Sequence, residues 1–377
     1  MIRLFFVSHS IPPTNDLLEN IGGMQRASLQ LLEALRNEVH FNVLPFLLMS
    51  SWRFIHIQTA FFLIKLIFRL PIAIRRQRPE IVLFSSMVTA AVMLFIKKKG
   101  SSPKYVAIAH GRDVTLPNPL YQIILKCVFK KLDGVIAVSS ATKASCMACG
   151  LSSDQVVVIP NAIPPGYDTL PIPPKTIADF LFQNHHIPRE ARPVLLTVGR
   201  LVLRKGHAWF IEHVLQRLDH DVIYLIVGDG PEYDTIRQTI ARSPKRHTIA
   251  LLGKMPEDWL LGLYEYADIF VMPNISVPGD IEGFGIVLLE ANRAGLPAVV
   301  TDIEGITDVV TDGLNGYRVK QNDAAGFANK IDSLLKKNMK QAKPQIQQHV
   351  RGHFIWPCVI EKYNRYFASL SPRATQS

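Results

Sequence analysis

The sequence predicts an α/β protein with two doubly wound parallel sheets, and two observations carry this prediction. Short apolar runs that end in small or polar residues recur along both halves of the chain, and each precedes an amphipathic stretch. Continuously apolar runs are typical of strands that are buried on both faces under helices. Strand and helix patterns also alternate within each half, which favours two domains of the Rossmann-like kind.

The predicted strands of the first half are IRLFFVSHS, EIVLFSS, KYVAIAHG, GVIAVSS and VVVIP, and those of the second are PVLLTVGR, VIYLIVGDG, IALLG, DIFVMP and PAVVTD. Eight prolines lie between residues 160 and 193, and this density disfavours both helix and central strand. We therefore predict an N-terminal domain over residues 1–165, a linker region over 166–192 and a C-terminal domain over 193–353. The last apolar stretch predicts a closing helix, with residues 354–377 packing back on the first domain.

Charge is distributed unevenly along a chain of otherwise globular composition. Residues 1–165 contain 18 Lys and Arg against 8 Asp and Glu, whereas the remainder contains 24 against 23. Such asymmetry suggests that the first half faces an anionic surface, either lipid headgroups or nucleic acid.

The N-terminal apolar run is too short for a signal peptide, which favours a cytoplasmic protein. Cys146 and Cys149 form a C-x-x-C without a second ligand pair, so we expect reduced cysteines on a helix.

The segment DIEGFGIVLLEANRAG, residues 280–295, contains the most informative motif. Glu282 precedes Gly283 and Gly285, which open a predicted helix that runs through Glu290. Free N–H groups at a helix start favour a diphosphate, and glycines let the backbone approach it closely. Because eight helical residues rise about 12 Å, the two carboxylates could accept hydrogen bonds from hydroxyls at both ends of a nucleotide sugar. Alternatively, Glu282 stabilises the first helical turn and Glu290 is a solvated helix residue.

This motif, E-G-F-G-I-V-L-L-E, resembles the E-x7-E signature of the retaining GT-B glycosyltransferases of glycosyltransferase family 4. Further segments of the second half fit that family in order: TVGRLVLRKGH, IVGDGP, LLGKMPEDWLLGLYEYADIFVMPN and AGLPAVVTDIEGITDVVTDGLNGYRV. The first half matches more weakly, through I-G-G-M, AHG, AVSSATK and IPNAI. The resemblance implies the GT-B fold, in which two Rossmann-like domains face a cleft and the second domain binds the donor.

Two cations follow the first strand of the second domain. Arg200 and Lys205 lie after PVLLTVG, where fixed positive charge would stabilise a departing nucleoside diphosphate. The resemblance assigns both residues this role, although basic residues after a strand are more often solvated.

Asp219-His220-Asp221 spells D-x-D, the metal motif of the other major glycosyltransferase architecture. It precedes its strand, so we interpret it as a polar turn, and we expect neither a metal nor a cofactor.

Candidate residues of the first domain follow its strands. The resemblance gives His110, which ends KYVAIAH, a role beside the reacting carbon. His9, Asp113, Ser139 and Asn161 are further candidates at the ends of strands. Gly22 and Gly23 precede the helix QRASLQLLEAL, and the resemblance places this loop near the donor phosphate or the acceptor. A plain tight turn is the alternative there. With Gly283, Phe284, Gly285 and Glu290, these glycines complete the predicted donor-binding set.

Residues 52–78 are the most apolar stretch, but Lys65, Arg69 and Pro71 interrupt it. We interpret it as an amphipathic helix that lies on an anionic membrane surface rather than spanning it. Arg75, Arg76, Arg78 and Lys97-Lys98-Lys99 add a basic neighbourhood. The alternative is a helix packed on the first sheet with a solvated basic edge. Nucleic acid is not expected as a partner because no zinc-finger, helix-turn-helix or aromatic RNA-binding signature is present.

The resulting prediction is a retaining, metal-independent hexosyltransferase, peripheral on the inner face of the membrane. It would move a hexose-type sugar from a nucleoside-diphosphate sugar to a glycan or lipid-linked acceptor in cell-surface polysaccharide or glycolipid synthesis. The resemblance implies front-face attack, in which the leaving phosphate helps take the acceptor proton. Two alternatives remain open: a catalytically inactive GT-B subunit that scaffolds a glycan-assembly complex, and a sugar-nucleotide epimerase, which usually lacks the E-x7-E arrangement.

Overall fold

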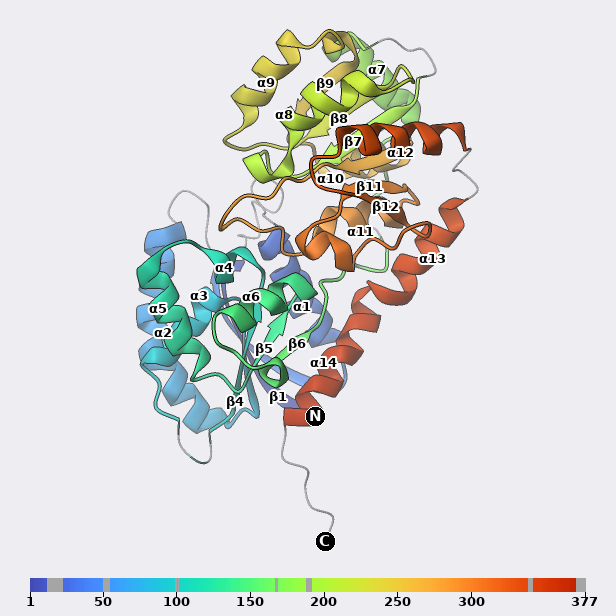
Figure 1. The fold of residues 1–377 in the computed structure, drawn as a ribbon. Coiled ribbons are helices and arrows are strands. Elements are labelled where there is room, and N and C mark those ends of the chain that lie inside the picture. The colour runs from blue at the N-terminus through green and yellow to red at the C-terminus, as the bar shows by residue number, and fades with distance from the viewer. Residues whose placement is uncertain are drawn as a thin grey trace. The chain divides into compact units, whose positions relative to one another are not determined.

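The chain folds into two compact α/β units (Figure 1). The computed structural model describes residues 1–11, 23–49, 55–98, 100, 102–166, 169–187, 192–337 and 342–370. The first unit comprises Met1–Pro164, Pro278–Phe284 and Ile355–Ser377, and the second comprises Pro165–Val277 and Gly285–Phe354. Each unit is built around a six-stranded parallel sheet, so the predicted fold class is confirmed. The cleft between two facing domains stays a prediction.

The sheet of the first unit has the order β2-β1-β3-β4-β5-β6. Its strands are β1 (Ile2–Ile11), β2 (Phe41–Met49), β3 (Ile81–Phe84), β4 (Lys104–Ala109), β5 (Gly134–Ala137) and β6 (Val156–Val158). Five of these correspond to the predicted apolar runs, whereas β2 was not predicted. β2 pairs only with β1 and contains Pro45, which an edge strand tolerates because one side of it makes no ladder hydrogen bonds.

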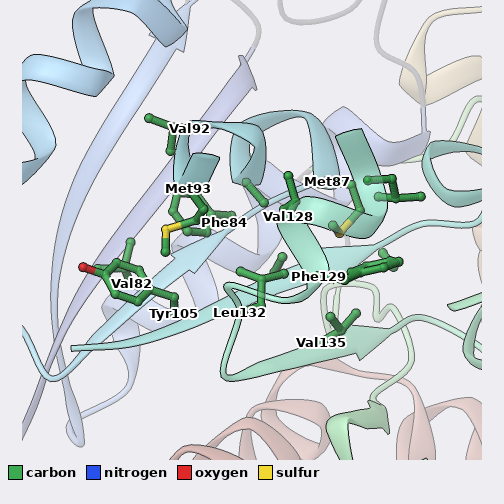
Figure 2. Close-up of a cluster of buried hydrophobic side chains, with 14 of the residues drawn as sticks. Val82, Phe84, Met87, Val92, Met93, Tyr105, Val128, Phe129, Leu132 and Val135 are labelled. Carbon is green, nitrogen blue, oxygen red and sulfur yellow. The ribbon is translucent and has the colours of Figure 1, made fainter. Parts of the chain in front are cut away.

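Helices cover both faces of this sheet. They are α1 (Gly23–Asn37), α2 (Ile55–Gln77), α3 (Met87–Ala90), α4 (Arg112–Thr115), α5 (Pro119–Phe129), α6 (Ser140–Ala148) and α14 (Trp356–Leu370), with the 3-10 turns η2 (Ala91–Leu94) and η3 (Ser153–Gln155). α2, α3, η2, α5 and α6 share one apolar core with alternate residues of β1, β3, β4 and β5, such as Val82, Phe84 and Tyr105 (Figure 2). α14 contacts α1, and Phe367 of α14 packs edge-on against Phe41 of β2.

The sheet of the second unit has the order β12-β11-β10-β7-β8-β9. Its strands are β7 (Val194–Val198), β8 (Ile223–Val227), β9 (Ile249–Gly253), β10 (Ile269–Met272), β11 (Ala298–Thr301) and β12 (Gly316–Val319). Its helices are α7 (Pro174–His185), α8 (His207–Trp209), α9 (Tyr233–Arg242), α10 (Glu257–Tyr266), α11 (Ile286–Arg293), α12 (Ala324–Lys336) and α13 (Lys343–His353). Shorter turns are η4 (Leu203–Lys205), η5 (Phe210–Val214), η6 (Leu215–Arg217), η7 (Arg246–Thr248) and η8 (Glu304–Asp308). β12, the edge strand beside β11, was not predicted as a strand.

The proline-rich stretch does not exclude helix, and that part of the prediction was wrong. α7 lies inside the expected linker region and begins at Pro174. Proline is well accommodated in the first helical turn because the backbone donor that it lacks has no intrahelical partner there. The helix then buries Ile177 and Leu181. Pro173 and Pro174 therefore mark the start of a helix of the second unit rather than an irregular connection.

Candidate functional site

The loops that follow β7 and β8 pack backbone against backbone in the second unit. The Gly199 N–H donates to the Val227 carbonyl over 3.0 Å, and the Leu201 N–H donates to the Asp229 carbonyl over 2.9 Å. A side chain at Gly228 would overlap the Gly199 carbonyl oxygen. Glycine is therefore required at position 228 for this close approach, which its φ of 141° also favours. The backbone contacts between the two loops therefore hold the main chain around Arg200 in place.

Lys205 is a buried cation at this edge of the sheet. It ends the turn η4 and is 7% exposed, whereas Arg200 is exposed. A Cβ atom at Gly199 would lie 3.8 Å from the Lys205 Nζ atom, so the lysine side chain folds back over the end of β7. The Ile275 N–H, just beyond β10, donates to the Arg204 carbonyl over 2.9 Å and ties this turn to the neighbouring strand. Burial of an ammonium group is costly, which makes Lys205 a stronger candidate than its exposed neighbour for a site that receives an anion.

His207, which sequence reasoning did not single out, is buried directly after the Lys205 turn. Its side chain is 3% exposed, and within the described part of the chain neither ring nitrogen has a hydrogen-bond partner. Burial, and secondarily the Lys205 ammonium group, lower the pKa of His207 to about 3. The imidazole is therefore neutral at pH 7, and it adds no charge beside Lys205.

Helix α11 begins immediately after Gly285, whose φ of 84° suits glycine. Glu290 lies inside this helix, is 7% exposed and accepts a 3.0 Å hydrogen bond from the Tyr264 hydroxyl of α10. The reading of Glu290 as a solvated residue is therefore wrong. The expected helical spacing of the two glutamates is also wrong, because α11 starts at Ile286 and Glu282 lies before it in non-helical chain.

His110 follows β4 in the first unit, and its geometry is fixed from two sides. Its Nε2 atom lies 2.8 Å from the Ser85 carbonyl oxygen, which only accepts, so Nε2 carries a proton and donates. The His110 backbone N–H donates to Asp113 Oδ1 over 2.7 Å, and the Met87 N–H approaches Asp113 Oδ2 at 3.3 Å. Burial raises the pKa of the Asp113 carboxyl. Asp113 therefore joins the turn after β4 to the start of α3.

The other first-unit candidates occupy the same edge of the sheet or cap helices. His9 lies in β1 two residues before its end, and its Nδ1 atom lies 3.4 Å from Ser86 Oγ, after β3. Burial and then the charge of His110 lower the pKa of His9 to about 4. Ser139 caps α6 by accepting from the Thr142 N–H at 3.1 Å, which is a structural role, and Asn161 is buried.

The strip Pro278–Phe284 carries the first half of the motif and packs on the first unit, which the sequence did not predict. Arg112 forms a 3.6 Å ion pair with Asp280, and a Cβ atom at Gly111 would lie only 2.9 Å from Gly283 Cα. A side chain at Gly283 would overlap the His110 carbonyl oxygen. The strip that bears Glu282 is therefore mounted on the His110–Gly111 turn.

The predicted site residues thus fall into two sets. The first unit brings His110 together with the strip of Glu282, Gly283 and Phe284, in which Glu282 and Phe284 are buried. The second unit holds Arg200, Lys205, Gly285 and Glu290 after β7 and β10, two adjacent strands. Gly23 is the exposed first residue of α1, and Gly22 lies outside the described residues.

The described residues contain no cluster of three His, Cys, Asp or Glu side chains that could hold a metal ion. The D-x-D segment is a polar turn, as predicted. The backbone N–H groups of Asp219 and His220 donate to the Asp332 carboxylate over 3.0 and 3.2 Å, before β8 begins. Of the two cysteines expected on a helix, Cys146 lies in α6, whereas Cys149 directly follows it. Metal independence stays a prediction.

Two known families match adjacent parts of the chain. Glycosyltransferase Family 4 matches residues 21–167, and Glycosyl transferases group 1 matches residues 180–349. The GDP-mannose-dependent alpha-(1-6)-phosphatidylinositol monomannoside mannosyltransferase of Mycolicibacterium smegmatis is 28% identical over 261 residues, which are 68% of this chain and 67% of that protein. The putative colanic acid biosynthesis glycosyltransferase WcaL of Escherichia coli is 27% identical over 171 residues, or 44% of this chain and 42% of that protein.

Solved structures share the fold at low sequence identity. HepE of Anabaena in complex with UDP-glucose aligns with a TM-score of 0.73 and 16% identity, over 98% of this chain and 100% of that chain. Sucrose-phosphate synthase from Thermosynechococcus elongatus aligns with a TM-score of 0.75 and 18% identity, over 98% and 99%. The two six-stranded parallel sheets with flanking helices form the GT-B fold. The chain belongs to glycosyltransferase family 4.

Proposed function

We propose that this glycosyltransferase moves a hexose-type sugar from a nucleoside-diphosphate sugar to a glycan or lipid-linked acceptor during synthesis of a cell-surface polysaccharide or glycolipid. Relatives support the acceptor class, since their names refer to a phosphatidylinositol mannoside and to colanic acid. Binding of UDP-glucose by a protein of the same fold supports the donor class. In this proposal the reaction takes place at the inner, cytoplasmic face of a membrane, where a lipid-linked acceptor would be held.

The observation that carries the proposal is the buried Lys205 ammonium group over Gly199, with Arg200 after the same strand. As the donor reacts, negative charge grows on the terminal phosphate of the departing nucleoside diphosphate. A cation that is already held in place stabilises this charge without reorganisation, and a buried one does so more strongly than an exposed one. Lys205 and Arg200 therefore take the role that a divalent metal takes in other transferases.

The remaining site residues bind and orient the donor sugar in this proposal. Glu290, held by Tyr264, accepts a hydrogen bond from a donor hydroxyl, and Glu282 does so beside His110. The reaction retains configuration: the bond between the anomeric carbon and the phosphate oxygen breaks, and the acceptor oxygen bonds to the same face. The acceptor proton passes to the departing phosphate oxygen, so no protein carboxylate is needed as a nucleophile.

The first test is a thermal-shift screen of the purified protein against GDP, UDP, ADP and their hexose conjugates, without added metal. A ligand that binds the native state raises the melting temperature by mass action. We expect one nucleotide family to raise it and Arg200→Ala to reduce the shift. Turnover of the stabilising conjugate then separates an enzyme from an inactive scaffold subunit. The proposal fails if nucleotides raise the melting temperatures of wild type and Arg200→Ala equally, or if the bound donor is neither hydrolysed nor transferred.

A further inference from the structure

Helix α2 is apolar on two opposite faces, and only one of them is covered. Leu66 and Leu70 are buried in the core of the first unit. Five large apolar residues on the other side are each more than half exposed: Ile57, Phe61, Ile64, Phe68 and Ile72. At 100° per residue they occupy a strip about 80° wide, centred opposite the buried leucines. A helix that is apolar all round is normally buried, so this second face calls for a partner.

The exposed apolar surface continues beyond α2. The turn η2 contacts both α2 and α5, and Phe95, directly after η2, is 66% exposed. On α5, Leu120 and Ile123 are also more than half exposed. All three elements pack on the same core and hence on the same face of the sheet. We call this surface, made by the five α2 residues with Phe95, Leu120 and Ile123, the apolar face.

Positive charge flanks the apolar face. Residues 39–132 contain 14 Lys and Arg but only two acidic residues, Glu80 and Asp113, and neither α2 nor α5 contains an acid. Lys65 and Arg69 lie along one edge of the α2 strip, and Lys126 and Lys130 are exposed on or directly after α5. This combination of exposed apolar side chains with flanking cations is typical of proteins that insert into the headgroup region of anionic lipid.

We propose that the apolar face docks on an anionic lipid bilayer, with α2 lying in the plane of the interface. By length and composition alone, Ile57–Gln77 could cross a membrane. However, α2 connects β2 to β3, which flank β1 in one sheet, and its leucines belong to the core of that sheet. Spanning would remove the helix from this core. This inference adds a membrane surface to the partners in the proposed function. It rests on the proposed function only in that a lipid-linked acceptor would lie in the same membrane.

Two other occupants fit the charge pattern less well. A second copy of the chain would bring the same cations against each other, which is unfavourable at a self-complementary interface. Nucleic acid would satisfy the cations but would leave the large aliphatic side chains of α2 and α5 without an apolar environment, because bases stack on aromatic rings rather than on such chains. A bilayer supplies acyl chains and anionic headgroups together.

The test is co-sedimentation of the full chain, without nucleotide, with vesicles of phosphatidylcholine alone or with phosphatidylglycerol added. We expect wild-type protein to bind the mixed vesicles. Phe61→Gln with Phe68→Gln should lower the partition coefficient roughly tenfold or more, because two aromatic rings that would insert into the bilayer are lost. Lys65→Gln with Arg69→Gln should lower it roughly tenfold on anionic vesicles only. The matched control, Leu170→Gln with Phe182→Gln, changes exposed apolar residues of the second unit and should bind like wild type.

Three results would overturn the inference. These are absence of wild-type binding to anionic vesicles, unchanged binding of the double phenylalanine variant, or a dimer that this variant dissociates while no vesicles are bound. Circular dichroism and melting temperature establish that each variant is folded. Donor hydrolysis in solution needs no vesicles, and the phenylalanine variant should keep it. Failure of the membrane inference and failure of the proposed transfer are therefore distinguishable.

Discussion

The two units share one architecture but use charge differently. In the first unit, cations are spread over exposed helical surface beside large apolar side chains, and the acids are few. In the second unit the numbers of acids and bases nearly balance, yet Lys205 and Glu290 are each only 7% exposed at their positions after β7 and in α11. Net charge thus indicates which surface attracts an anionic partner, whereas burial of individual charges indicates where a small ligand is held.

The largest expected effect follows from the buried cation. Lys205→Ala should lower kcat/KM for donor turnover by about 10²–10³-fold, the range seen when one fixed transition-state donor is removed. Lys175→Ala, an exposed lysine of α7 in the same unit, is the matched control and should be neutral. Steady-state kinetics with the donor found in the nucleotide screen measure both. Equal losses in the two variants would mean that burial does not distinguish the functional cation.

The strip that bears Glu282 can be displaced without changing its charges. An alanine methyl at Gly283 would overlap the His110 carbonyl oxygen, so Gly283→Ala should push the strip away from the His110 turn. We expect kcat to fall about tenfold to a hundredfold through misplacement of the site. Gly352→Ala places a methyl where, within the described residues, no atom beyond its chain neighbours and its own helix backbone lies within 4 Å, and should leave kcat unchanged. Wild-type turnover in both variants would show that contact between the strip and the turn is irrelevant to function.

Substitutions at Asp113 and Asp133 distinguish the positioning of His110 from the stability of the first unit. Asp113 accepts from the His110 N–H, whereas Asp133 accepts from the Tyr105 N–H at the opposite end of β4. Replacement of either by Asn should reduce the free energy of unfolding by about 1–3 kcal/mol. Only Asp113→Asn should also lower kcat, by about tenfold, with little change in KM. Urea unfolding and steady-state kinetics test this prediction. An equal loss of kcat in Asp133→Asn would mean that Asp113 contributes only to stability.

The smallest effect is a pH dependence of stability. His207 is neutral when folded because burial lowers its pKa to about 3, whereas an unfolded histidine titrates near 6.5. Below pH 6.5 the unfolded chain therefore binds more protons, and stability is lost as pH falls from there toward the folded pKa. Each such histidine contributes a slope of up to about 1.4 kcal/mol per pH unit. Urea unfolding between pH 7.5 and 5.5 should give a smaller slope for His207→Leu, and equal slopes would contradict the account.

Much of the fold could be predicted because buried parallel strands have a continuous apolar pattern. Two edge strands, β2 and β12, were missed because Pro45 in β2 and Arg318 in β12 interrupt the continuous apolar pattern, whereas the edge strands β6 and β9 keep that pattern and were predicted. α7 was missed because its prolines come at the start of the helix, where they are tolerated.

The site was predictable in residue type but not in environment. Spacing and family resemblance pointed to Arg200, Lys205 and Glu290. The hydrogen bond from Tyr264 to Glu290 and the packing of Pro278–Phe284 on the His110 turn join residues far apart in sequence. Such contacts become visible only when the chain is folded, and they decide which charges are buried.

The most direct measurement of the central claim is isothermal titration calorimetry with the nucleoside diphosphate that gives the largest thermal shift. Three proteins are compared: wild type, Lys205→Ala and Phe61→Gln with Phe68→Gln. We expect Lys205→Ala to raise Kd at least about tenfold, because one fixed charge-assisted contact is lost, and the phenylalanine variant to bind like wild type. An unchanged Kd in Lys205→Ala would contradict the assignment of the donor phosphate to the second unit.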